Sequence, residues 1–262
     1  MLGAIRRVAR NALEHTSVGY RFLLKRDFGV TGPHGYPRAP WANAVLKSEL
    51  EVRESVEQVQ RLGLPSMTAD LPKHWDSLAA LDLILSTTGR GSRIFDAGSE
   101  LYSPILPWLF LYGYEDLTGG NLAFSKKIRR GPIAYEHSDI TKTAFSATSV
   151  DAVTCLSVIE HGVDLDAYFK EMSRIIRVGG ILVTSTDYYE TPVDTRSQEA
   201  YGATIHIFTR EEITRALDLA KGYGFALLSP IDLSCEEKVV HWREYDLHYT
   251  FVVFSLRKVS ER

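Results

Sequence analysis

The chain has 262 residues and a formal net charge of −3, with 45% hydrophobic and 24% charged residues. This composition is typical of one large globular domain or a domain with an extension, and the charge gives no argument for nucleic-acid or membrane binding by the chain as a whole. Two cysteines far apart, Cys155 and Cys235, exclude a disulfide scaffold and favour a reducing compartment, so we expect a cytoplasmic protein.

The first 30 residues are the most basic part of the chain. They contain two acidic residues, Glu14 and Asp27, and six basic residues: Arg6, Arg7, Arg10, Arg21, Lys25 and Arg26. Four apolar residues share one face of a helix in this segment: Leu2, Ile5, Ala9 and Leu13. The helix either packs on its own domain with the arginines outward, which we favour, or makes peripheral contact with an anionic membrane surface. The segment has no continuous apolar core, so we expect no signal peptide.

Next along the chain comes a connection rich in proline and glycine, residues 31–40. A long helix is predicted from Trp41 to Leu62, and a second from Trp75 to Ser86. We therefore predict that residues 1–90 form a helical N-terminal extension that acts as a substrate cap.

From Arg93 the pattern changes to short apolar runs that alternate with helical stretches. The runs lie at 93–96, 115–119, 133–137, 151–156 and 181–186. This alternation predicts parallel strands joined by crossover helices. The clearest helix spans 164–177, and we expect Gly179-Gly180 to end it. Another helix begins at Thr209, which forms a capping box with Glu212.

Two final apolar runs, residues 225–233 and 249–257, predict an antiparallel hairpin at the edge of the sheet. The predicted fold is α/β: a Rossmann-like, open, mostly parallel seven-stranded sheet with an antiparallel last strand, preceded by the α-helical N-terminal extension. The sheet domain is expected over residues 91–262.

Ligands of an open parallel sheet bind outside the carboxyl ends of its strands. Polar groups follow each of the five predicted parallel strands. They are Asp96, Asn121, Asp139, Ser157, Glu160, His161 and Asp187. Scattered loop residues would seldom produce this recurrence, so we expect a ligand site at this edge of the sheet.

Residues 149–187, SVDAVTCLSVIEHGVDLDAYFKEMSRIIRVGGILVTSTD, resemble the class I S-adenosylmethionine-dependent methyltransferases. The likeness covers the fourth strand, the Glu-His step, the amphipathic helix, the glycine pair and the fifth strand of that family, in the same order. The run IFDAGSELYSP, residues 94–104, resembles the family's first cofactor loop but lacks its further glycines. Residues 91–262 are accordingly similar to a methyltransferase domain.

The resemblance implies S-adenosyl-L-methionine as cofactor, with S-adenosyl-L-homocysteine as product. The implied cofactor-binding residues are Asp96, Ala97, Gly98, Ser99, Asn121, Asp139, Ile140, Leu156 and Ser157. Asp96 would orient the first loop or receive the ammonium group, and the backbone at Gly98 would approach the methionine part. The cofactor has no pyrophosphate, so one close glycine suffices, and we favour a working loop over one that has lost its ligand.

The rest of the cofactor would be bound by later strand ends. Asn121 stands where the family usually has an acidic residue for the ribose hydroxyls, and it brings no charge. Asp139 and the backbone of Ile140 would bind the adenine edge. Leu156 and Ser157 would line the methionine end.

Methyl transfer to a hydroxyl needs an aligned acceptor and a base that removes its proton. Our candidate bases are His161, His206 and Asp187, with His161 preferred because it follows the fourth strand. Each has a structural alternative: His161 as a hydrogen-bonded histidine near a helix start, His206 as an ordinary strand residue, and Asp187 as a turn cap.

Some members of the family bind magnesium through an E-x-x-E-H element at this position. This chain has Ser157 in place of the first glutamate, while Glu160 and His161 remain, so we expect no metal to be required and keep magnesium as the alternative. The aromatic tail, residues 235–249, either stacks on a sugar or packs as a hairpin. The spacing of His241 and His248 is not diagnostic of a metal.

The function expected first is O-methylation of a small-molecule or glycan hydroxyl, with a His or Asp as general base. The glycan acceptor rests on the segment LPKHWDSLAALDLIL, residues 71–85, which resembles extensions of methyltransferases in bacterial polysaccharide pathways. One alternative is a non-catalytic module that binds a partner. The other is a nucleic-acid methyltransferase, which is disfavoured because no Asn/Asp-Pro-Pro-aromatic signature follows the fourth strand. The sequence leaves the oligomeric state open.

Overall fold

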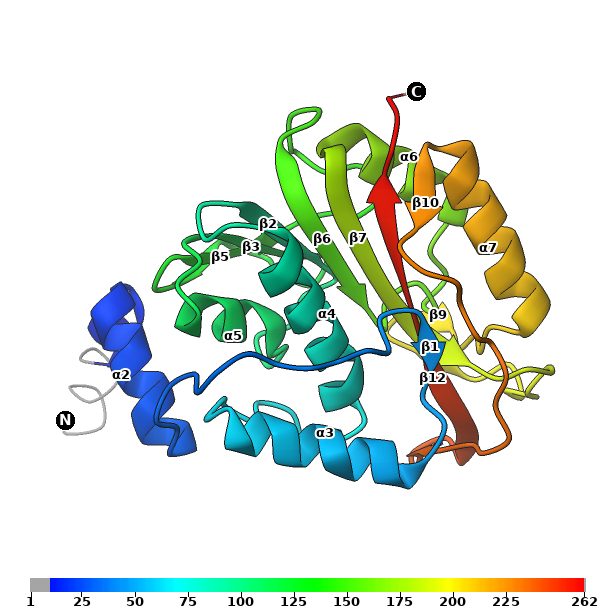
Figure 1. Cartoon of the computed structure of the whole chain (residues 1–262), viewed down its shortest axis with the longest axis horizontal. Coiled ribbons are helices and arrows are strands. Elements are labelled where there is room, and N and C mark those ends of the chain that lie inside the picture. The colour runs from blue at the N-terminus through cyan, green and yellow to red at the C-terminus, as the bar shows by residue number, and fades with distance from the viewer. Residues whose placement is uncertain (1–9, 262) are drawn as a thin grey trace.

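The computed structural model describes residues 10–261, which form a mixed, mostly parallel β-sheet with helices on both faces (Figure 1). Within that range the main sheet has ten strands. Eight follow one another across it: β1 (Ala44–Val45), β12 (Leu247–Lys258), β7 (Ile176–Tyr188), β6 (Val150–Leu156), β2 (Arg93–Ala97), β3 (Asp116–Asn121), β5 (Ile133–His137) and β4 (Ile128–Arg130). The two others, β10 (Phe225–Leu227) and β11 (Val240–Trp242), pair with β12.

The five predicted parallel strands are all present, and they pair in parallel with one another in the order β7, β6, β2, β3 and β5. The long strand β12 runs antiparallel to β7 over residues 250–257. The Rossmann-like fold class with an antiparallel last strand is therefore confirmed, with short extra strands beyond the seven expected.

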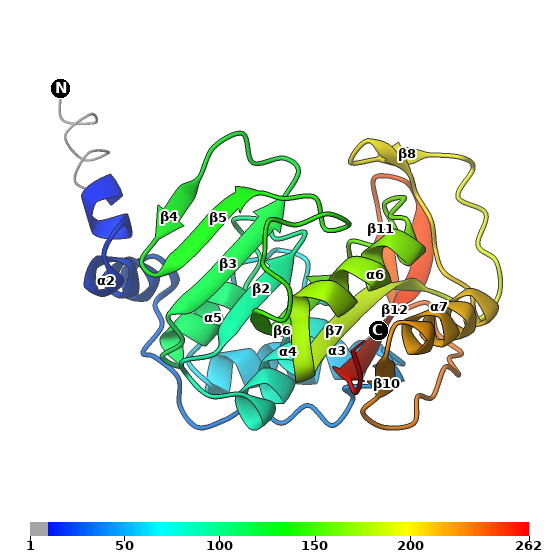
Figure 2. The ribbon, with the colours of Figure 1, turned by 90° about the horizontal axis from the view of Figure 1, so that it is seen from above.

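Helices separate into two layers (Figure 2). One face carries α3 (Glu49–Arg61), α4 (Lys73–Thr87) and α5 (Ile105–Leu111), and the other carries α6 (Leu165–Ile175) and α7 (Arg210–Gly222). Successive side chains of a strand point to opposite faces of the sheet, so each central strand contributes to the hydrophobic cores on both faces. In β12, Phe251 and Val253 pack on the α4 side, while Val252 and Phe254 pack on the α6 side.

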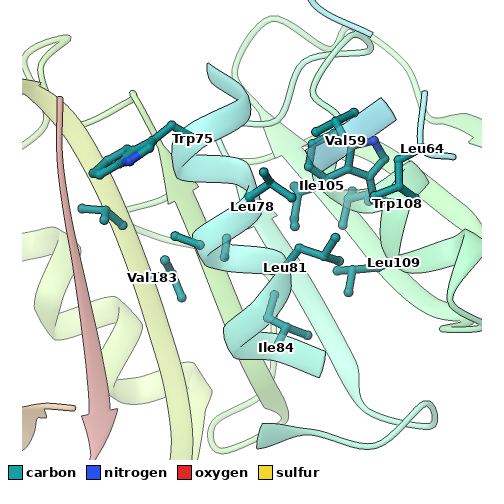
Figure 3. Close-up of a cluster of buried hydrophobic side chains, with 14 of the residues drawn as sticks. Val59, Leu64, Trp75, Leu78, Leu81, Ile84, Ile105, Trp108, Leu109 and Val183 are labelled. Atoms are coloured by element: carbon teal, nitrogen blue, oxygen red, sulfur yellow. The ribbon is translucent and has the colours of Figure 1, made fainter. Parts of the chain in front are cut away.

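Helix α4 lies between α5 and the strands β6 and β7 (Figure 3). Trp75, Leu78, Leu81 and Ile84 of this helix are all at most 1% exposed. Burial of each such side chain contributes on the order of 1.5–3 kcal/mol relative to leaving it exposed. This packing holds the first turn of α4, and the polar residues on it, rigidly at the carboxyl ends of β6 and β7.

The predicted helix from Trp41 to Leu62 is wrong in its first half. Residues 44–45 pair with Val252 and Val253 of β12, and α3 begins only at Glu49. Ser48 caps this start by accepting a hydrogen bond from the backbone N–H of Glu51. Strand pairing thus overrides helical periodicity here.

The glycine pair also has a different role from the one expected. Helix α6 ends at Ile175, and Gly179 and Gly180 lie inside β7. A Cβ at Gly180 would stand 2.8 Å from the carbonyl oxygen of Asp151 in β6. The glycine therefore allows β6 and β7 to approach rather than ending the helix.

The predicted C-terminal hairpin is confirmed in pairing but not in position. Residues 225–227 pair antiparallel with residues 256–258, as expected. However, β12 is not at the edge, because β7 lies on one side and β1, β10 and β11 share the other. The capping box of Thr209 and Glu212 is present at the start of α7.

The basic N-terminal segment is packed on the domain where the structure describes it. Helix α2 (Ser17–Phe28) buries Tyr20, Leu23 and Leu24, and Arg21 donates hydrogen bonds to carbonyl oxygens at the end of α5. The predicted apolar face lies in the preceding segment, of which only Leu13 is described, and it is exposed, so the choice between packing and membrane contact stays a prediction. The predicted contributions of Arg6, Arg7, Leu2, Ile5 and Ala9 lie outside the described residues. Between residues 10 and 261 no helix is both long and apolar enough to cross a membrane.

Candidate active site

A cavity of about 1090 Å³ opens at the carboxyl ends of the parallel strands. Most of the residues singled out from the sequence line it: Asp96, Ala97, Gly98, Asn121, Asp139, Ile140, Leu156, Ser157, His161 and Asp187. Ser99 and His206 are not among its lining residues. The structure thus brings ten of the expected twelve residues to one cavity.

The loop after β2 is shaped by a close contact with the loop after β6. Gly98 has a φ of 83°, and a Cβ there would stand 2.3 Å from Cγ2 of Val158. Its backbone N–H donates to the carbonyl oxygen of Gly120 at 2.8 Å. A glycine is therefore required at this position by the packing of two loops.

Asp96 presents an unsatisfied carboxylate oxygen. Its Oδ1 accepts a hydrogen bond of 2.6 Å from Thr154, while Oδ2 is buried without a partner among the described residues. Burial raises the pKa of Asp96 to about 6. A buried acceptor of this kind is costly unless a ligand satisfies it, and a cation suits it best.

Asn121 holds the first loop in place. Its amide nitrogen donates to the carbonyl oxygens of Gly98 and Ser99 and to the carboxylate of Glu100, all within 3.3 Å. Its side-chain oxygen accepts from the N–H of Ala123 at 2.9 Å. The side chain is thus engaged within the protein, and the charge expected at this strand end is supplied next to it by Glu100.

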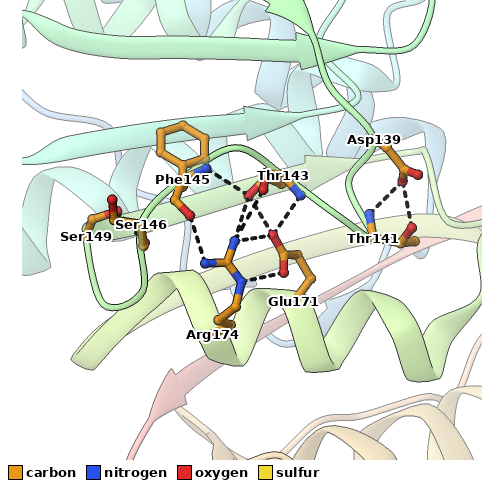
Figure 4. A network of polar contacts seen from close by, with 8 residues as sticks. All are labelled: Asp139, Thr141, Thr143, Phe145, Ser146, Ser149, Glu171 and Arg174. Atoms are coloured by element: carbon orange, nitrogen blue, oxygen red, sulfur yellow. Dashed lines mark hydrogen bonds and ion pairs between the residues drawn. The ribbon is translucent and has the colours of Figure 1, made fainter.

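Asp139 lies on an exposed turn whose conformation is fixed by its own side chain (Figure 4). Its Oδ1 accepts from the backbone and the hydroxyl of Thr141 at 2.8 and 2.7 Å. These hydrogen bonds lower the pKa of Asp139, so it is ionised at neutral pH. The following segment is tied to α6, where Glu171 accepts from Thr143 and pairs with Arg174.

Ser157 takes a left-handed backbone conformation, with φ 53°, directly after β6. Its N–H donates to the carbonyl oxygen of Ser185, while its buried hydroxyl finds no partner within residues 10–261. A non-glycine residue in this conformation is uncommon and is found preferentially at functional sites. The hydroxyl is available to a ligand.

His161 is half-buried and lies edge-to-face with Tyr201, with ring centroids 4.9 Å apart. Its Nδ1 is buried and has no partner in the described part of the chain. Burial, together with the Lys73 ammonium, lowers the pKa of His161 to about 4. The ring is therefore neutral at pH 7 and is a weak base.

Two acidic groups and a lysine converge at the floor of the cavity. Glu160 and Asp187 are 1% and 3% exposed, and Lys73 enters from the first turn of α4 with its Nζ 4.4 Å from the centre of the Phe251 ring. Burial and the Glu160 carboxylate raise the pKa of Asp187 well above its usual range, and burial likewise raises that of Glu160. Although burial opposes it, the surrounding carboxylates raise the pKa of Lys73, so the lysine stays charged.

Asp76 extends this group from the same first turn of α4. It is fully buried, and its Oδ2 accepts a hydrogen bond of 2.6 Å from the Ser185 hydroxyl of β7. Burial raises its pKa. The helix thus ties its polar face directly to the strand that carries Asp187.

His206 lies apart from this group. It is exposed, and its Nε2 lies 3.2 Å from the carboxylate of Glu212. Ile205 and Ile207 on either side are buried. This arrangement matches the structural alternative of an ordinary residue in an extended segment.

Lys73, Asp76, Glu100 and Tyr249 line the cavity but were not proposed as site residues from the sequence. The sequence did hold a signal for Lys73 and Asp76. They are three residues apart and so lie on one face of the first turn of a mostly apolar helix, which is typical of a buried polar site. Tyr249 belongs to the aromatic tail for which sugar stacking was one alternative, and Glu100 stands in the first cofactor loop, where it could face either the cofactor or solvent.

Residues 111–184 match a family model described as a methyltransferase domain. The fold is that of the class I methyltransferases. A geranyl diphosphate methyltransferase in complex with geranyl diphosphate and sinefungin is 18% identical, with a TM-score of 0.53, and the match covers 98% of each chain. Geranyl diphosphate C-methyltransferase from Streptomyces coelicolor A3(2), solved with Mg²⁺, geranyl diphosphate and S-adenosyl-L-homocysteine, is 17% identical, with a TM-score of 0.52 and coverage of 92% and 98%.

A third solved structure, a SAM-dependent methyltransferase from Methanosarcina mazei, is 15% identical, with a TM-score of 0.51 over 68% of this chain and 98% of that one. A comparison with curated proteins finds no match. The resemblance to class I methyltransferases read from the sequence is confirmed. At such low identity the structural likeness establishes the fold, and the acceptor has to be argued from this chain's own residues.

Proposed function

We propose that this protein is a methyltransferase that uses S-adenosyl-L-methionine to methylate a hydroxyl group of a small molecule, with Asp187 as the general base. The observation that carries the proposal is the pair of buried carboxyl groups, Glu160 and Asp187, with the half-buried Lys73, which line the same cavity as the loop after β2. One end of the cavity thus suits a cationic cofactor, and the other suits proton removal.

The cofactor supplies the reactive methyl group. Its ammonium would be held by the unsatisfied oxygen of Asp96, and its ribose hydroxyls by Glu100, which takes the place of the acidic residue missing at Asn121. The free oxygen of Asp139 suits the exocyclic amine of adenine. The unpartnered hydroxyl of Ser157 is one more polar group for the methionine end.

On the acceptor side, Asp187 is a better base than His161. A general base works best when the pKa of its conjugate acid lies near the working pH. The pKa of Asp187 is shifted up toward that range, whereas that of His161 is shifted down to about 4. The Lys73 ammonium would stabilise the negative charge that develops on the acceptor oxygen.

The cavity lining favours a neutral, hydroxyl-rich acceptor such as a saccharide. It contains only two cationic side chains, Lys73 and Arg243. It contains eight carboxylates: Asp70, Asp76, Asp96, Glu100, Asp139, Glu160, Asp164 and Asp187. Although burial raises the pKa of Asp76, Glu160 and Asp187, acidic groups still outnumber the two cations, which disfavours a diphosphate acceptor without a metal ion. Aromatic rings at Tyr102, Tyr201 and Trp242 offer surfaces on which a sugar ring can stack.

The role of a substrate cap for residues 1–90 belongs to the same proposal. Its support is that α4 contributes Lys73 and Asp76 to the cavity, so the acceptor end would be incomplete without the extension.

Calorimetric titration with S-adenosyl-L-methionine and S-adenosyl-L-homocysteine tests the cofactor step, with Asp139→Ala beside the unchanged protein. Binding in the micromolar range that weakens in the variant supports the proposal. Transfer of a labelled methyl group to a panel of sugars, phenols and amines, with added magnesium or with EDTA, then identifies the acceptor. No binding at millimolar cofactor would contradict the proposal and favour a non-catalytic module.

A further inference from the structure

The β11–β12 hairpin gathers two histidines and an aspartate at the rim of the cavity. His241 in β11 lies directly opposite His248 in β12. Asp246 occupies the last position of the turn between them, residues 243–246. Nitrogen and oxygen atoms of the three side chains all lie within 4.8 Å of one another.

The two imidazole rings are stacked, with centroids 4.0 Å apart and an angle of 12° between their planes. Both point an Nε2 at the same oxygen of Asp246, His241 from 3.3 Å and His248 from 3.9 Å. One carboxylate oxygen thus faces two imidazole nitrogens from the same side. One cation can be bound by all three atoms when the rings turn out of the parallel stack, because the lone pair of each Nε2 lies in the plane of its ring.

The backbone is arranged to produce this geometry. Asp246 has a φ of 52°, in the left-handed region, which Asp and Asn tolerate better than other side chains do. The turn is also braced from outside, because Arg196 donates hydrogen bonds to the carbonyl oxygens of Tyr245 and Asp246. The aspartate is therefore held over the histidine pair.

We propose that His241, Asp246 and His248 form a binding site for a divalent transition-metal ion of the zinc class. Zinc binds imidazole nitrogen and carboxylate oxygen at about 2.0–2.2 Å, so two tetrahedral ligands stand about 3.4 Å apart. The observed separations of 3.3 and 3.9 Å are close to that spacing. Imidazole ligands select zinc, copper, nickel or cobalt over magnesium. Three protein ligands leave a coordination position open to water or a ligand.

The site lies at the rim of the cavity, so a bound ion would affect the residues that form this rim. His241, Trp242 and Arg243 line the cavity, and the Trp242 ring stacks on Tyr201 at 6.4 Å. Tyr201 in turn contacts His161. It lies between β8 (Glu199–Ala200) and β9 (Ala203–Thr204), which form a separate two-stranded sheet. An ion bound to the hairpin turn would fix the position of Trp242 and, through its contact with Tyr201, stabilise the segment 199–204. The metal-site proposal does not rest on the proposed methyl transfer.

Titration of the tag-free protein with Zn²⁺ by calorimetry, and with Co²⁺ by visible absorption, tests the site. We expect one ion per chain and a Co²⁺ band typical of tetrahedral coordination, unaffected by millimolar Mg²⁺. His248→Gln and Asp246→Asn should each weaken binding at least tenfold. Asparagine is chosen at position 246 because it tolerates the left-handed backbone conformation found there. His206→Gln is the matched control, because His206 also faces a carboxylate at 3.2 Å but has no second histidine beside it.

Unchanged stoichiometry and affinity in His248→Gln and Asp246→Asn would overturn the site, and so would an equal loss in His206→Gln. Limited trypsin digestion tests the effect on the rim. Zn²⁺ should slow cleavage after Arg243 and Arg196 in the unchanged protein but not in Asp246→Asn. Cleavage at the same rate with and without Zn²⁺ would contradict this stabilisation.

Discussion

The Asn121 amide donates a hydrogen bond of 3.2 Å to the Glu100 carboxylate and so links the end of β3 to the loop after β2. The same nitrogen also binds the carbonyl oxygens of Gly98 and Ser99. An acidic residue at position 121 would lose these donated bonds and face a second carboxylate. The asparagine and the glutamate therefore act as a unit, with the loop support at one position and the charge at the other.

We accordingly expect Glu100→Gln to weaken S-adenosyl-L-methionine binding by about tenfold, the size of one hydrogen bond to a charged group. Asn121→Asp should weaken binding and lower the free energy of unfolding by about 1–3 kcal/mol, because buried carbonyl oxygens lose their donor. Calorimetry and urea unfolding measure the two effects. Tighter binding in Asn121→Asp would show instead that position 121 contacts the ribose itself.

Burial of Asp96 predicts a specific pH dependence of stability. Its pKa is about 6 in the folded protein against an ordinary value of 3.8, so folding favours the protonated form. The cost of ionising it is absent below pH 3.8, grows between pH 3.8 and 6, and is complete above pH 6. Two pKa units correspond to about 3 kcal/mol.

Urea unfolding of the cofactor-free protein from pH 4.5 to 7.5 measures this cost. The free energy of unfolding should fall with rising pH relative to that of Asp96→Asn, which carries no charge to bury. Asp139→Asn is the control: the pKa of Asp139 is lowered below its ordinary value of 3.8, so the group stays ionised from pH 4.5 to 7.5 and its replacement should add no slope in that range. Parallel curves for the unchanged protein and Asp96→Asn would contradict the prediction.

Local patterns in the sequence were enough to predict the parallel strands, the capped helix at Thr209 and the cluster of strand-end residues. Each depends on residues near one another in the chain, such as the apolar run of β6 or the Thr209–Glu212 pair. Lys73 and Glu100 were missed because their roles arise from tertiary packing. The facing of His241 and His248 likewise depends on a hairpin register that their spacing does not reveal.

Gly98 is expected to be intolerant of any side chain. Gly98→Ala combines a φ of 83° with a Cβ at 2.3 Å from Val158, and we expect a loss of about 1–3 kcal/mol of stability. Val158→Ala in the same chain removes the two closest contacts, at 2.3 and 2.7 Å, but leaves the Cβ of residue 158 at 3.0 Å and the backbone strain, so the double variant should recover part of the loss. Gly89→Ala is the control, because a Cβ there meets nothing within 4 Å. Urea unfolding of the unchanged protein, Gly98→Ala, Val158→Ala and the double variant measures the coupling, with Gly89→Ala measured beside them, and simple additivity would argue against the clash.

The choice between Asp187 and His161 as base gives the sharpest test of the catalytic assignment. Asp187→Asn should lower kcat by about 10²–10⁴-fold, the usual contribution of a general base. His161→Gln should lower it less than tenfold, because a neutral ring with a pKa of about 4 has little basicity to lose. His206→Gln, outside the cavity, should leave kcat unchanged.

Affinity for S-adenosyl-L-homocysteine, measured on the same variants, separates catalysis from cofactor binding and should stay within a few-fold of the unchanged protein. The rate should also rise with pH as the Glu160–Asp187 pair loses its proton, since burial and mutual repulsion raise both pKa values. Asp187→Asn should remove that rise. Glu160 still loses its proton in this variant, but the group that takes the acceptor's proton is gone. If His161→Gln shows the larger loss of kcat and Asp187→Asn keeps the pH dependence, the base is His161 and the carboxylate pair only positions the acceptor.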